Sequence, residues 1–207
     1  HYPLRRQRQM CIRDRVEVMQ FAAEDSLHNP MGSSRRNGRV CFAGSFYAED
    51  FERRREAQVE LLDAASAFQL DIYDRNFGGS ASDTKFRFPE KFAGRIRGKL
   101  GFDELCGKYR EYQVFLNVNS VDDSKTMFSR RVFELLACGT PVVSTYSEGI
   151  EETFGNDIVW QVRNGKEATE ALRILLSDPI EWRRRSLAGI RAVHSSHTYR
   201  PVSYTHL

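Results

Sequence analysis

Short apolar runs alternate with helical segments along most of the chain, and this alternation limits the possible fold more than any other feature. Five runs rich in β-branched and aromatic residues predict strands, at 39–45, 70–74, 114–119, 141–145 and 157–162. Helical periodicity separates these runs. Strands joined through helices are typical of a parallel sheet that is covered on both faces. We therefore expect an α/β domain with a Rossmann-like, doubly wound parallel sheet, which binds its ligand beyond the carboxyl ends of the strands.

The expected helices follow the same alternation. Their ranges are 51–68, 103–112, 128–138, 149–154, 167–178 and 180–194. The helix at 128–138 has the clearest end, because Gly139 follows it and Pro141 comes just beyond.

The two ends of the chain differ from the part between them. The run RRQRQ near the start resembles a basic arm that binds polyanions. However, VSYTH at 202–206 and MCIRD at 10–14 can be encoded by one short DNA element read in opposite orientations, which resembles a translated sequencing adapter. We therefore predict that 1–15 and 201–207 are adapter-derived, that 16–38 is the remnant of an interdomain linker, and that 39–200 is the folded domain. The alternative is a real, disordered basic tail.

Without these ends the charge changes sign. The chain has 31 Lys and Arg against 28 Asp and Glu, and the two ends hold five Arg and one Asp, which leaves 26 basic and 27 acidic residues. The balance of −1 argues against nucleic-acid binding, so the runs Arg53 to Arg55 and Arg183 to Arg185 are interpreted as solvated helix faces.

Membrane and metal signals are weak in this sequence. The longest apolar stretches fall short of the roughly 20 residues that span a bilayer. Cys41, Cys106 and Cys138 form no CxxC pair, and the histidines show no ligand spacing. We expect no metal site and no transmembrane segment, and a reducing, cytoplasmic location.

One segment, FSRRVFELLACGTPVVST at 128–145, carries candidate site residues. Arg130, Arg131 and Glu134 share one helical stripe, opposite an apolar stripe. Two arginines in a first turn oppose the helix dipole, at about 0.3–1 kcal/mol each, and such a misfit is typical of an anion site. Ionised Glu134 only accepts hydrogen bonds, which suits a ribose diol. The alternative is a solvated face on which Arg130 and Glu134 form an i,i+4 ion pair.

This segment resembles the donor-site signature of GT-B glycosyltransferases, in the group 1-like, spore-coat-maturation-type branch. Other parts of the pattern are NPMG (29–32), CFAGSFY (41–47), DIYDR (71–75), FLNVNSV (115–121) and HTY (197–199). The resemblance covers about 27–200. It implies the C-terminal, donor-binding half of a GT-B fold from a bacterial, metagenomic source, with the acceptor held mostly by an N-terminal domain that this chain lacks.

The resemblance also implies roles for single residues. Arg130 and Arg131 would neutralise the diphosphate of the leaving group as catalytic residues. Glu134 would bind the ribose hydroxyls, and Phe128 and Ser129 take the place of a Phe-Gly turn at the phosphate or sugar.

Further donor-binding residues are expected at two other places. Gly44 and Ser45 would let the backbone approach the phosphates, although Gly44 equally fits a plain strand-ending turn. Thr126 stands where many members have a second glutamate that contacts the sugar. Asp122 and Asp123 are near but out of register, so the sugar and the stereochemical outcome stay open.

The implied activity is hexosyl transfer from a nucleoside-diphosphate sugar without a metal or cofactor, with this fragment inactive alone. The alternative is a non-catalytic α/β nucleotide-binding or interaction module. No GxGxxG follows a predicted strand, which argues against a nicotinamide-dependent oxidoreductase.

Overall fold

The computed structural model describes residues 20–32, 35–49, 51–79 and 84–199, so the predictions for 1–15 and 201–207 lie outside the described residues. Within this part, a six-stranded sheet has the order β3-β2-β1-β4-β5-β6. All five neighbouring pairs are parallel. This is the strand order of doubly wound Rossmann-like domains, and it confirms the predicted fold class.

The strands are β1 (Val40–Gly44), β2 (Leu70–Asp74), β3 (Ile96–Gly98), β4 (Val114–Asn117), β5 (Val142–Thr145) and β6 (Trp160–Val162). The helices are α2 (Glu52–Ala65), α3 (Phe102–Glu111), α4 (Arg131–Ala137), α5 (Glu148–Ile158), α6 (Gly165–Ser177) and α7 (Pro179–Ser196), with 3-10 turns η1 (Thr84–Phe86) and η2 (Glu90–Arg95). All five predicted strands are present. The strand β3 was not predicted from the sequence. It is a three-residue edge strand, and Arg97 on it forms a 2.6 Å ion pair with Asp71 on β2.

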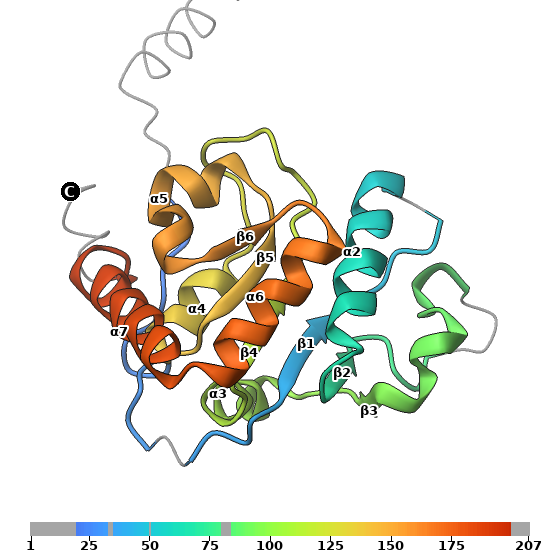
Figure 1. Cartoon of the computed structure of the whole chain (residues 1–207), viewed down its shortest axis with the longest axis horizontal. Coiled ribbons are helices and arrows are strands. Elements are labelled where there is room, and N and C mark those ends of the chain that lie inside the picture. The colour runs from blue at the N-terminus through green and yellow to red at the C-terminus, as the bar shows by residue number, and fades with distance from the viewer. Residues whose placement is uncertain (1–19, 33–34, 50, 80–83, 200–207) are drawn as a thin grey trace, which may run out of the picture.

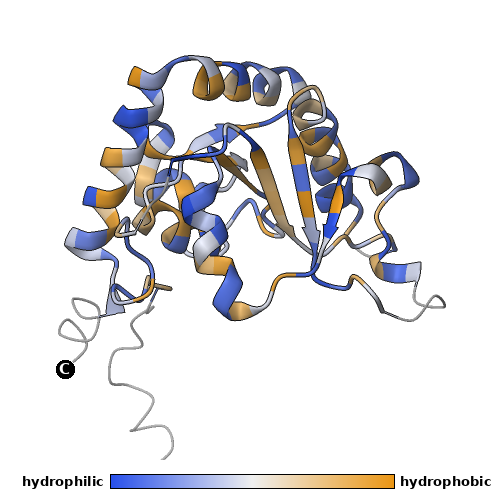
Figure 2. Ribbon diagram, turned by 90° about the horizontal axis from the view of Figure 1, so that it is seen from below, coloured by the Kyte–Doolittle hydropathy of each residue, from blue (hydrophilic) through white to orange (hydrophobic). Residues whose placement is uncertain are grey.

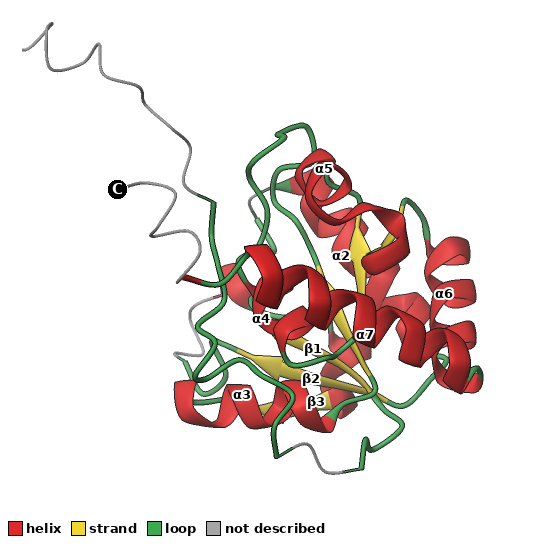
Figure 3. Ribbon diagram, turned by 90° about the vertical axis from the view of Figure 1, so that its left-hand side faces the viewer, coloured by secondary structure: helices red, strands yellow, loops and turns green. Residues whose placement is uncertain are grey.

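Helices cover both faces of the sheet (Figures 1 and 3). One buried cluster joins α2, α6 and η2 to the sheet, through residues such as Leu62 and Leu172. The other joins α3, α4, α5 and α7 to the opposite face, through residues such as Tyr109, Leu136 and Val193. Apolar residues accordingly follow the strands and the inner sides of the helices in Figure 2. In Figure 1 the carboxyl end of β1 points upward, toward the part of the molecule that holds the start of α2.

The helix predicted at 128–138 is shorter than expected, because α4 begins at Arg131. Phe128 lies before the helix, and its buried ring stacks on Phe133 at a centroid distance of 5.1 Å. This contact places the Phe128 ring in the core, while the backbone at 128–129 is not helical, which helical periodicity does not predict.

The end of α4 is as predicted. Gly139 adopts the left-handed conformation, with φ of 71°. Its N–H donates to Leu136 O at 3.0 Å, and the N–H of Thr140 donates to Leu135 O at 3.0 Å, which together close the helix as a Schellman motif.

The described part of the predicted linker, 20–32 and 35–38, packs on the domain. Ala23 accepts a backbone hydrogen bond from Tyr199 and donates one to His197, so the segment lies beside the end of α7. The Arg36 guanidinium donates to the carbonyl oxygens of Tyr109 and Tyr112 at 2.7 and 3.0 Å. It also donates to the oxygens that follow α4, on Cys138, Gly139 and Thr140. Arg36 therefore joins the carboxyl ends of α3 and α4.

We expect Gly139→Ala to lower the free energy of unfolding by about 1–3 kcal/mol. A side chain at this φ is strained, and its Cβ would lie 2.9 Å from Ile190 Cδ1. The matched control is Gly107→Ala, inside α3 with nothing within 4 Å of the added Cβ, which should stabilise the chain by about 0.5–1 kcal/mol. Urea unfolding of both variants measures the difference, and equal effects would contradict the role of Gly139.

We also expect stability to fall as the pH drops below about 6.5. Burial lowers the pKa of His28, against an opposing effect of Glu134, and burial likewise lowers the pKa of His197. The unfolded chain therefore binds protons first, so this stabilisation is present above the unfolded pKa and is lost below it. Urea unfolding at about pH 7.5 and about pH 5.5 should show a smaller decline for the His28→Gln, His197→Gln double variant than for the native chain.

Candidate functional site

A cavity of about 320 Å³ opens at the carboxyl ends of β1 and β4. The strand order reverses between these two strands, because β1 leads into α2 on one face and β4 leads into α4 on the other. Ligands of doubly wound sheets bind at such a point. Its walls are formed by Phe42, Gly44, Ser45, Tyr47, Arg54, Arg75, Asn117, Val118, Asn119, Ser120, Val121, Met127, Phe128, Ser129 and Arg131.

Arg131 reaches into this cavity from the start of α4. Its Nη1 donates to the carbonyl oxygen of Ala43 on β1, which holds the guanidinium over the end of that strand. Its Nε is buried and has no hydrogen-bond partner among the described residues. Gly44 leaves room for this arrangement, since a Cβ there would lie 3.1 Å from the Phe42 ring and 3.7 Å from Arg131 Nη1.

The charge of the cavity is one-sided. Arg54, Arg75 and Arg131 come from α2, from the turn after β2 and from α4, and the described residues of the wall include no Asp or Glu. Guanidinium groups recognise phosphate and carboxylate through several hydrogen bonds at once. The cavity is therefore suited to an anion.

Arg130 and Glu134 lie apart from the cavity wall. Arg130 Nε pairs with Glu134 Oε1 at 2.8 Å, and the hydroxyl of Tyr109 donates to Glu134 Oε2 at 2.9 Å. The i,i+4 pair of the alternative interpretation is thus present, although Glu134 is buried rather than solvated. Arg130 pairs with Glu134, whereas Arg131 donates to Ala43 O on β1, so of these two arginines only Arg131 belongs to the described cavity wall.

Glu134 sits in a polar corner between α4, α3 and the segment that contains His28. Burial raises the pKa of Tyr109, so its hydroxyl stays protonated and donates to the carboxylate. A carboxylate oxygen that accepts one hydrogen bond has a further lone pair. Glu134 therefore keeps free lone pairs, on a residue that is only 6% exposed.

Some of the remaining predicted residues line the cavity and others lie outside its wall. Gly44, Ser45, Phe128 and Ser129 all line the cavity together with Arg131. Thr126 is exposed in a bend and does not belong to the cavity wall. Asp122 lies 3.1 Å from Arg53 in an exposed ion pair, and Asp123 is exposed.

A buried amide network in the wall of the cavity was not predicted from the sequence. Asn117 and Asn119 hydrogen-bond each other at 3.0 Å, and both donate to Ser144 Oγ on β5, at 3.0 and 3.1 Å. Asn119 also binds Thr145 through its N–H and its side chain, at 2.9 and 2.8 Å. The sequence does contain a signal for this network, because both asparagines interrupt an apolar run at the end of a predicted strand.

Two arginine runs are only partly solvated, which corrects their interpretation. Arg54 lines the cavity, and Arg55 donates to Ala48 O at 2.7 Å, whereas Arg53 is exposed. Arg185 is buried, and its guanidinium lies 4.1 Å above the Trp160 ring. Consecutive residues on a helix face different directions, so the arginines of one run differ in their exposure and contacts.

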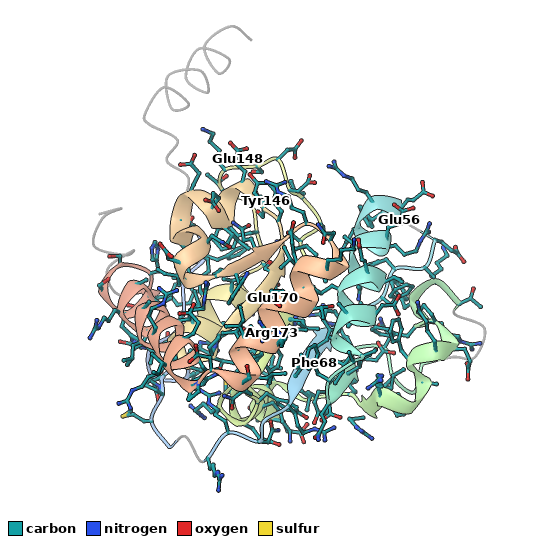
Figure 4. All side chains as sticks on the ribbon, viewed as in Figure 1. Glu56, Phe68, Tyr146, Glu148, Glu170 and Arg173 are labelled. Atoms are coloured by element: carbon teal, nitrogen blue, oxygen red, sulfur yellow. The ribbon has the colours of Figure 1, made fainter. Side chains whose placement is uncertain are left out.

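Figure 4 locates this edge of the sheet. The carboxyl edge of the sheet lies in the upper part of the figure, near Glu56 on α2 and near Tyr146 and Glu148, which follow β5. Phe68, which precedes β2, lies lower, toward the amino edge of the sheet. Within the described ranges, no three His, Cys, Asp or Glu side chains are placed to hold a metal ion. In the same ranges, no helix has both the length and the apolar character to cross a membrane.

Comparison with solved structures agrees with this architecture. The chain is similar to sucrose-phosphate synthase from Thermosynechococcus elongatus, with TM-score 0.68 and 15% identity over 97% of this chain and 55% of that one. It is similar to a glycosyltransferase from Rickettsia africae, with TM-score 0.70 and 15% identity over 92% of this chain and 55% of that one. A third is the C-terminal domain of a group 1 family glycosyl transferase from Francisella tularensis, with TM-score 0.55, 11% identity and coverage of 86% and 99%.

The chain thus spans about half the length of the first two structures and nearly all of the isolated C-terminal domain. At these identities the likeness shows the fold alone. No curated protein matches the sequence. A family model described as glycosyl transferase-like matches residues 35–203, which is most of the chain. The chain therefore belongs to the glycosyl transferase-like family.

Proposed function

We propose that this domain binds the nucleoside-diphosphate sugar of a glycosyltransferase, and that the acceptor is held by a part of the protein outside this chain. The observation that carries the proposal is the cavity at the reversal of strand order, with three arginines and no carboxylate among its described wall residues. Family membership supports the same reaction class.

The diphosphate is proposed to lie in this cavity, against Arg131 and Arg75. Departure of the sugar adds negative charge to the nucleoside diphosphate, and cations already in place stabilise that charge where it develops. Arg131 is the best placed, because its contact with Ala43 O fixes the guanidinium before a ligand arrives. The proposed transfer requires no metal.

Glu134 is proposed to accept hydrogen bonds from the ribose. Arg130 then acts through Glu134, since their 2.8 Å ion pair orients the carboxylate, instead of touching phosphate itself. The sugar is proposed to be a hexose, on the resemblance of the signature segment. The proposed setting is the cytoplasm of a bacterium. A general base for the acceptor would come from the acceptor-binding part, so this chain alone is expected to bind donor without transferring sugar.

The first test is titration calorimetry of the chain with UDP, GDP and inorganic pyrophosphate. Arg75→Gln should weaken binding by roughly 2- to 10-fold, because an exposed guanidinium contributes a partly screened contact. Arg183→Gln, which changes another exposed arginine, on α7, is the control and should bind as the native chain does. Absence of heat with all three ligands would overturn the donor site.

The second test separates ribose from phosphate. Glu134→Gln should weaken the better nucleoside diphosphate by about 3- to 30-fold, because a charged hydrogen bond to the ribose is lost, and should leave pyrophosphate binding unchanged. Glu170→Gln, an exposed position on α6, is the control. Equal weakening of pyrophosphate would show that Glu134 acts on the cavity and not on a ribose.

A further inference from the structure

Arg54 reaches the cavity from the first turn of α2, across from Arg131. Its guanidinium lies over the Tyr47 ring, 4.6 Å from the centroid. Its Nη1 donates to Gln58 Oε1 at 2.9 Å, and the buried Gln58 in turn donates to Ser45 O at 3.3 Å. One ring and one amide therefore set the direction of this side chain.

Among the described residues, Arg54 has no counter-charge, unlike its neighbours on α2. Arg53 pairs with Asp122, and Arg55 with Glu52. Over the residues that the structure describes, Arg54 has no ion pair, and its buried Nε has no hydrogen-bond partner. Burial lowers the pKa of this guanidinium. A partly buried cation without an opposite charge is costly, and an anion in the cavity would offset that cost.

Tyr47 is itself held in place by two rings. Phe51 meets it edge-on at 5.8 Å, and Phe86 meets it edge-on at 5.5 Å. Phe51 has a φ of 57°, and in the described ranges no other non-glycine residue has a positive φ. The contacts with both rings hold the Tyr47 ring beside the guanidinium of Arg54.

We propose that Tyr47 is a positioning residue, which fixes the guanidinium of Arg54 in the cavity so that Arg54 binds the diphosphate from the side opposite Arg131. This inference rests on the proposed function, and it names residues that the signature segment does not contain. A cation over an aromatic face is attracted most where water is excluded. The ring also limits the rotamers of a long side chain, which lowers the entropy lost when the anion binds.

The test is a double-mutant cycle on the full chain, with affinities for UDP, GDP and pyrophosphate from titration calorimetry. Arg54→Gln should weaken binding by about 10- to 100-fold, while Arg53→Gln, with the same charge change one position away, should change it by less than about 2-fold. Tyr47→Leu should weaken binding by roughly 3- to 10-fold. Tyr47→Phe should bind with native affinity, because it keeps the aromatic ring.

The double variant Tyr47→Leu, Arg54→Gln decides the mechanism. It should bind no more weakly than Arg54→Gln alone, since the ring acts only through the guanidinium. Additive losses would overturn the proposal by showing that Tyr47 touches the ligand itself, and so would equal effects of Arg54→Gln and Arg53→Gln. Thermal unfolding of each variant separates loss of binding from loss of fold. If the native chain binds none of the three probes, the proposed donor site is wrong. If it binds them but the losses are additive, or Arg54→Gln and Arg53→Gln have equal effects, only this inference is wrong.

Discussion

Reversal of strand order between β1 and β4 is the constraint on which the rest of this structure depends. All six strands are parallel, so their carboxyl ends share one edge of the sheet. The chain leaves β1 toward one face and β4 toward the other, and the two connections diverge instead of covering the gap. Arginines on α2 and α4 therefore meet across a cavity although they are 77 positions apart in the sequence, at 54 and 131. Neither face of the sheet could build this site alone.

Partly buried guanidinium groups make two kinds of contact in this fold. Arg36 donates to five oxygen atoms around the ends of α3 and α4 and stacks over Trp182, so its hydrogen-bonding capacity is largely used. Burial nevertheless lowers the pKa of Arg36 to about 10. Arg54 and Arg131 each keep a buried Nε without a partner in the described structure. The first pattern joins two helices, and the second leaves a buried donor on each of two arginines that line the cavity.

The same arginine that joins α3 to α4 also supports the ribose-binding candidate. Tyr109, whose carbonyl accepts from Arg36, donates its hydroxyl to Glu134 on α4. The position of the Glu134 carboxylate relative to the cavity is therefore set by the packing of two helices. That packing depends on the segment before β1. Ala23 in this segment forms backbone hydrogen bonds with His197 and Tyr199, at the end of α7.

Local sequence determined the elements of this protein. Alternating apolar and helical runs specified five of the six strands, and Gly139 specified the end of α4, because strand periodicity and a left-handed turn depend on neighbouring residues. Gly44, Ser45, Phe128, Ser129 and Arg131 were also identified and lie together. Tertiary structure alone decided the rest. It added β3 through an ion pair to β2, paired Arg130 with Glu134, buried Glu134 against Tyr109 of α3, and brought Arg54 and Arg75 to the cavity. Those outcomes depend on which elements pack against each other in the fold. Hydrophobic periodicity reports only on neighbouring residues, so it does not predict contacts between residues that are tens of positions apart.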